Sequence, residues 1–105
     1  MDAQKLFGKR IKELRKQSNY TQEQLSEILG VFQKQIGNIE TGTTFTTMNN
    51  LEKMAKIFGV EIQDLFNFSH LKNNEEIIKE INTLINQASD DKLRIIYKVI
   101  KDIVK

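Results

Sequence analysis

At 105 residues, the chain is long enough for one domain, or for one small domain with an appendage. It contains no cysteine, which excludes disulfides, thiolate nucleophiles and cysteine-based zinc sites. It has no apolar secretory core and no membrane-spanning run, so we expect a soluble cytoplasmic protein. The formal net charge of +2 neither indicates nor excludes a nucleic-acid partner.

Apolar residues at helical spacing predict a first helix from about Ala3 to Gln17. Its expected buried stripe consists of Leu6, Phe7, Ile11 and Leu14. Lysines occupy the other sides of this helix. They could contact phosphates, although a cationic helix surface is more commonly just solvated.

The stretch from Thr21 to Gly42 predicts two short helices joined by a tight turn. Thr21 is a suitable N-cap, and Gln24 three residues later completes a capping box. Gly30 tolerates the positive φ at which helices commonly stop. The first of the two helices has one apolar side, to which we assign Leu25, Ile28 and Leu29.

The second short helix, from Gln33 to Glu40, has two unlike sides. At 100° per residue, the inner side holds Ile36, Ile39 and Glu40. The outer side holds Gln33, Lys34, Gly37 and Asn38. Amides can bond an adenine edge in two places, lysine suits guanine acceptors or phosphate, and glycine allows close approach. On an isolated helix this would be an ordinary solvated face, but as the second helix of this motif it predicts base contacts in DNA.

Phe32 occupies the position before this helix, where an oxygen-bearing cap would stabilise the helix by about 0.5–2 kcal/mol. Its ring could meet a thymine methyl in the groove or fold back on the domain. Gly37 costs up to about 1 kcal/mol relative to alanine in mid-helix. Close approach to DNA would explain that glycine, although chance substitution is an alternative.

Residues from about Leu6 to Phe66 resemble the Cro/phage-repressor type (XRE family) helix-turn-helix domain. The matching residues are Phe7 to Arg15, Thr21, Gln22, Leu25, Gly30, Val31, Ile36, Ile39, Glu40, Gly42, Leu51, Met54 to Lys56, Phe58 to Val60, Leu65 and Phe66. The match covers over half of the chain without a gap. The resemblance implies an all-α, five-helix, lambda-repressor-like domain that binds DNA as a dimer.

The resemblance also implies roles for individual residues. Arg15 is expected to form an ion pair with Glu40 that ties the first helix to the third. Gln22 is expected to bond a DNA phosphate and to brace Gln33. The helix N-terminus that carries Thr21 and Gln22 favours a phosphate on physical grounds as well.

The turn after the second short helix carries three threonines, Thr41, Thr43 and Thr44. Their hydroxyls and backbone amides could contact phosphates, which fixes register without reading sequence. A plain polar loop is the alternative.

A fourth helix, capped by Thr47 and ended by Gly59, follows with the apolar residues Met48, Leu51, Met54, Ala55 and Phe58. A short fifth helix from Ile62 to Phe66 closes the predicted core with Leu65 and Phe66.

We place a DNA-binding domain at residues 1–68 and a helical hairpin at residues 69–105. The single histidine, His70, lies in the polar linker, so we expect no metal and no cofactor. One helix of the hairpin starts near Asn73, and the other follows Ser89. The last helix has a wide apolar arc, which indicates dimerisation through Ile96, Tyr97, Ile100, Ile103 and Val104. Docking on the same chain is the alternative.

The sequence thus predicts a sequence-specific double-stranded DNA-binding transcriptional regulator, a dimeric repressor acting on an inverted-repeat operator. An alternative is an antitoxin or other interaction module whose C-terminal helices bind a partner protein. We expect no enzyme, because the sequence lacks a nucleophile–base arrangement, a metal cluster and a phosphate-cradling loop.

Overall fold

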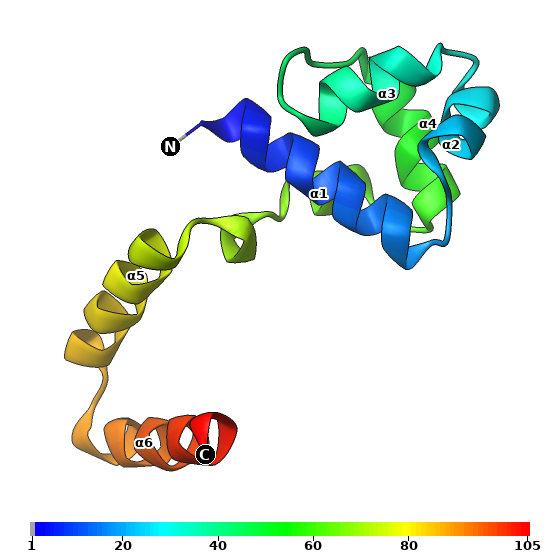
Figure 1. Ribbon diagram of the computed structural model, residues 1–105. Helices are drawn as coiled ribbons and strands as arrows, with labels where there is room; N and C mark the ends of the chain where they lie inside the picture. The colour runs from blue at the N-terminus through cyan, green and yellow to red at the C-terminus, as the bar shows by residue number, and fades with distance from the viewer. Residues whose placement is uncertain (1) are drawn as a thin grey trace. The chain divides into compact units, whose positions relative to one another are not determined.

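The computed structural model describes residues 2–105, and all regular structure within them is helical, as predicted (Figure 1). The chain divides into two compact units. One ends at Lys72, and the other covers Asn73–Lys105.

The first unit contains the helix-turn-helix motif and the helices that support it. Its α-helices are α1 (Ala3–Gln17), α2 (Gln22–Leu29), α3 (Gln33–Glu40) and α4 (Met48–Phe58). Two 3-10 helices follow, η1 (Ile62–Phe66) and η2 (Ser69–Leu71). The predicted fifth helix is therefore present as the 3-10 helix η1, and part of the predicted linker forms η2.

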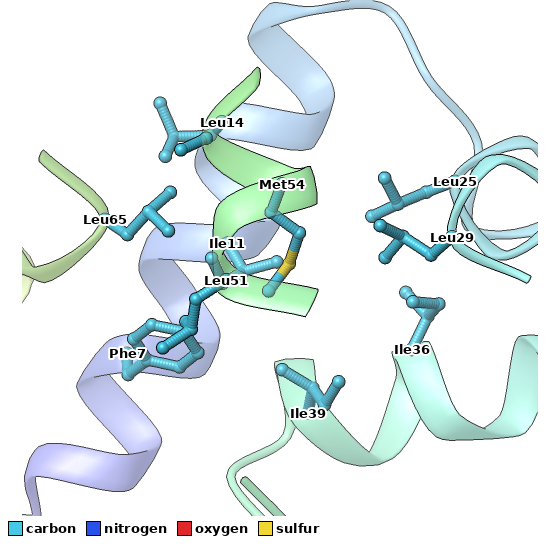
Figure 2. Close-up of a cluster of buried hydrophobic side chains, with 11 residues drawn as sticks. Phe7, Ile11, Leu14, Leu25, Leu29, Ile36, Ile39, Leu51, Met54 and Leu65 are labelled. Carbon is cyan, nitrogen blue, oxygen red and sulfur yellow. The ribbon is translucent and has the colours of Figure 1, made fainter. Parts of the chain in front are cut away.

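One apolar core joins all of these α-helices (Figure 2). Figure 2 shows that α1 contributes Phe7, Ile11 and Leu14, α2 contributes Leu25 and Leu29, α3 contributes Ile36 and Ile39, and α4 contributes Leu51 and Met54. Leu65 of η1 completes the cluster, and the Phe66 ring lies 5.1 Å from the Phe7 ring between centroids while remaining 43% exposed.

Besides Phe66, two further predicted core residues are exposed. Ile28 is 49% exposed, because the buried side of α2 is centred on Leu25 and Leu29 and includes Ser26 instead. Ser26 is small and satisfies its hydroxyl by donating to the Glu23 carbonyl. Met48 is 65% exposed, since it is the first residue of α4 and the core begins one turn later.

The N-terminal half of α1 packs closely against the end of α3. A Cβ atom at Gly8 would lie 2.6 Å from the Glu40 carbonyl oxygen, so only glycine fits at this crossing. Gln4 donates from Nε2 to the Gly42 carbonyl oxygen at 2.8 Å. Gly42 itself has φ +78°, a conformation that favours glycine. These contacts fix the end of the second motif helix on the first helix.

A polar cluster holds η2 against α1. The His70 Nε2 atom lies 3.0 Å from both carboxylate oxygens of Glu13, and Arg10 donates to the same carboxylate. Burial alone raises the pKa of Glu13, but the hydrogen bonds and charges of Arg10 and His70 outweigh it and leave that pKa lowered. Arg10 also donates from Nε to the Asp64 carbonyl oxygen at 2.9 Å. His70 is therefore a structural residue rather than a free linker residue.

The second unit consists of α5 (Asn74–Gln87) and α6 (Asp90–Val104). The helices begin where the sequence predicts, and Asn73 and Ser89 cap their N-termini by accepting from the amides of Glu76 and Lys92. No residue of either helix is buried. Many of their large apolar residues are exposed, namely Ile78, Ile81, Leu84, Leu93, Ile95, Tyr97, Val99, Ile100, Ile103 and Val104. Among residues 2–105, no helix has both the length and the apolar character needed to cross a membrane.

Candidate DNA interface

The α2–turn–α3 segment has the predicted caps at both ends of its first helix. Thr21 Oγ1 accepts from the Gln24 amide at 3.0 Å, and Gln24 Oε1 accepts from the Thr21 amide at 2.9 Å. Gly30 ends α2 in the left-handed conformation with φ +72°. Two residues later α3 begins, so the two helices are joined by a tight turn (Figure 1).

Helix α3 buries one side and leaves the other accessible. Ile36, Ile39 and Glu40 are buried, as the periodicity predicts. On the other side Gln33 and Lys34 are exposed, and Gly37 and Asn38 are half-buried. We call these four residues the reading face. Within the part of the chain that the structure describes, the side chains of Gln33, Lys34 and Asn38 form no hydrogen bond or ion pair. Their polar groups therefore remain available to a partner.

Glu40 links α3 to the rest of the motif through its buried carboxylate. Arg15 forms the two-point ion pair expected from the resemblance, with Nε 2.6 Å from Oε2 and Nη2 3.0 Å from Oε1. The hydrogen bonds from Arg15 to Glu40 raise the pKa of the arginine, although burial opposes this. Arg15 also donates to the Tyr20 carbonyl oxygen at 2.9 Å. One guanidinium thus fixes α3 and the loop before α2.

The side chain of Gln22 does not form the bond to Gln33 that the resemblance implies. Its Nε2 atom donates instead to Glu40 Oε1 at 3.1 Å. A carboxylate is a stronger acceptor than the neutral amide of Gln33, which accounts for this preference. Gln22 therefore joins the Arg15–Glu40 pair, and the Gln33 side chain stays unengaged.

The turn after α3 does not offer the free backbone amides that we expected. The Thr41 amide donates to the Gly37 carbonyl oxygen, and the amides of Thr43 and Thr44 both donate to that of Asn38. These bonds terminate the helix and engage the three amides within the protein. The threonine hydroxyls remain at the surface, with Thr41 Oγ1 2.9 Å from Thr43 Oγ1.

Two residues are unusual for this motif, Phe32 directly before α3 and Gly37 within it. The Phe32 side chain makes no capping bond, as predicted, and it is 82% exposed, so the ring does not fold back on the domain. Gln35 holds the helix start instead, because its Oε1 accepts from the Phe32 amide at 3.0 Å. A Cβ atom at Gly37 would meet nothing within 4 Å, so protein packing does not require that glycine.

No group of three or more potential metal ligands occurs among residues 2–105. A short helix, a glycine turn and a second helix that exposes amides and a cation on a packed scaffold define a helix-turn-helix DNA-binding protein.

Comparisons with known proteins agree with this class. The family model described as "Helix-turn-helix domain" matches residues 8–69. Control protein C.BamHI of Bacillus amyloliquefaciens is 35% identical over 72 residues, which cover 68% of this chain and 89% of that protein. The SPbeta prophage-derived HTH-type transcriptional regulator YonR of Bacillus subtilis is 30% identical over 81 residues, covering 76% of this chain and 75% of its own length.

A solved structure extends the agreement to three dimensions. The restriction-modification controller protein C.AhdI from Aeromonas hydrophila superposes with a TM-score of 0.55 at 30% identity, covering 58% of this chain and 92% of that one. The chain described here belongs to the helix-turn-helix family of DNA-binding transcriptional regulators, of the Cro/phage-repressor (XRE) type.

Proposed function

We propose that this regulator binds one specific double-stranded DNA sequence through the reading face of α3. The observation that carries the proposal is that the side chains of Gln33, Lys34 and Asn38 have no bonding partner within residues 2–105, while Glu40 fixes the helix that carries them. With α3 in the major groove, the two amides read adenine edges, and Lys34 reads a guanine or contacts a phosphate. Gly37 lets the backbone approach the bases.

Residues beside the reading face would hold the DNA backbone. Gln22 and Thr21 lie at the N-terminus of α2, where amides and the helix dipole favour a phosphate. The hydroxyls of Thr41, Thr43 and Thr44 would bond phosphates after α3 and set the register without reading bases.

In this proposal, residues 1–68 bind DNA and residues 69–105 form the dimer. The exposed apolar residues of α6, with Ile96 half-buried among them, support an association surface made of Ile96, Tyr97, Ile100, Ile103 and Val104. A twofold dimer would require an inverted repeat with half-sites about 10 base pairs apart. Such a cytoplasmic protein would act most simply as a repressor that blocks polymerase, and not as an enzyme.

The test is selection from a random duplex pool with the wild-type protein, Gln33→Ala and a control, Gln63→Ala, which alters an exposed glutamine of η1. We expect wild type and the control to enrich one inverted repeat. The Gln33→Ala protein should stay folded and lose the preference at one base pair of each half-site, a loss of about 1–3 kcal/mol in discrimination. Enrichment of the same site by all three proteins would contradict the role of Gln33, and folded wild type that enriches nothing would contradict direct specific binding.

A further inference from the structure

The most exposed large apolar side chain described in residues 2–105 is Phe32, at 82%. It lies at the N-terminal end of α3, next to Gln33. It belongs neither to the core cluster nor to the ring pairs that Phe7 forms with Phe45 and Phe66. A phenyl ring in water is unfavourable, so its position beside the reading face indicates a partner supplied from outside the domain.

The local backbone explains why the ring is held outward. Val31, the preceding residue, packs against the core. Phe32 is extended, with φ −74° and ψ 148°, and its side chain is exposed whereas that of Val31 is half-buried. Two hydrogen bonds fix this conformation, because the Phe32 amide donates to Gln35 Oε1 and the Phe32 carbonyl accepts from the Gln35 amide at 2.9 Å. The ring is therefore presented by a rigid segment.

We propose that Phe32 is a specificity residue that reads the 5-methyl group of a thymine in the major groove, at the base pair adjoining the one read by Gln33. The methyl group is the apolar feature that the major groove offers, and an aromatic side chain is among the groups that contact it. A serine cap at this position would favour the free helix but would offer the thymine methyl no apolar group. This inference rests on the proposed function, since it requires α3 to lie in the major groove.

The experiment replaces each thymine of the selected operator, one at a time, by deoxyuridine. Deoxyuridine keeps the same base-pairing groups and lacks only the methyl. For the wild-type full chain, we expect one thymine per half-site at which the replacement weakens binding about fourfold, the equivalent of one buried methyl group. In Phe32→Ala the penalty at that thymine should disappear, while penalties elsewhere remain.

Ile28→Ala is the matched control, because Ile28 is an exposed apolar residue of the same motif on α2. It should keep the full deoxyuridine penalty. Melting curves of both variants should match wild type, since neither side chain is buried. Equal penalties in wild type and Phe32→Ala, or none in either, would overturn the assignment even though the operator is bound. If Phe32→Ala had a lower mass in solution than wild type, the ring would be assigned to a contact between protein chains instead. If the wild-type protein selected no operator, the proposed function itself would be contradicted.

Discussion

At the scale of single residues, the orientation of α3 depends on the carboxylate of Glu40. Its side chain is 3% exposed, and the Arg15 side chain is 9% exposed. A buried charge without its partner costs several kcal/mol, whereas the loss of both partners can be nearly neutral. The pair is therefore best understood as a positioning device for the reading face.

We expect Arg15→Ala to destabilise the protein by about 3–5 kcal/mol, because it leaves Glu40 charged and buried with only Gln22 to donate to it. The melting temperature should fall by roughly 10 °C or more in a unit of this size. Thermal unfolding followed by circular dichroism measures the change. The double variant Arg15→Met, Glu40→Leu is the control and should recover much of the loss. A melting temperature unaltered by Arg15→Ala would show that the pair contributes little.

At the scale of elements, α1 supports the motif by direct backbone contact. The crossing of α1 and α3 lies at Gly8, where the Glu40 backbone occupies the space that a side chain would need. Gly37 provides the contrast, since it is also helical but faces open space. The two glycines therefore serve different purposes.

Gly8→Ala should destabilise the protein by about 1–3 kcal/mol or more, because α1 must move away from α3 to admit a methyl group. Gly37→Ala is the matched control and should stabilise the free protein by up to about 1 kcal/mol through helix propensity. Urea unfolding of both variants measures these free energies. If Gly8→Ala is as stable as wild type, the crossing is looser than the structure indicates. Weaker operator binding by the stable Gly37→Ala protein would support close approach to DNA.

Features set by neighbouring residues could be predicted from the sequence. The caps at Thr21, Thr47, Asn73 and Ser89 and the stops at Gly30 and Gly59 depend only on local hydrogen bonds and φ, and all are present. The buried side of a two-turn helix is less certain, because a periodic pattern leaves its centre free to shift by one residue, which misplaced Ile28. Contacts between distant residues, such as Gln22 with Glu40 or His70 with Glu13, have no local signal. The accessible side of α3 followed from periodicity alone.

At the scale of the whole molecule, the chain has one unit with a core and one without. No residue of α5 or α6 is buried, and even the apolar side chains of Ile103 and Val104 are 77% and 76% exposed. Two helices that bury so little are not expected to be stable by themselves, so we propose that association supplies the missing burial. A second copy of this chain is the partner that fits the proposed function, since the inverted-repeat operator proposed above would need two copies.

The double variant Ile100→Glu, Ile103→Glu should be a monomer in sedimentation equilibrium, because charges would be placed in an apolar interface. The first unit should keep its helices, and affinity for the inverted repeat should fall about a hundredfold or more as the linked second contact is lost. Lys98→Glu, a charge change at an exposed polar residue of α6, is the control and should remain dimeric. Unchanged mass of the double variant would place the dimer contact elsewhere. A monomeric wild type would favour a different protein as the partner of α6.

The unengaged side chains of the reading face have a consequence for how this protein can evolve. Gln33, Lys34 and Asn38 contribute no side-chain bond to the fold, whereas Arg15, Gln22 and Glu40 bond to one another. After gene duplication, a copy could acquire a new target through a few codon changes in α3 while inheriting its scaffold intact. Its stability would be under tight purifying selection, and its target would be free to diverge.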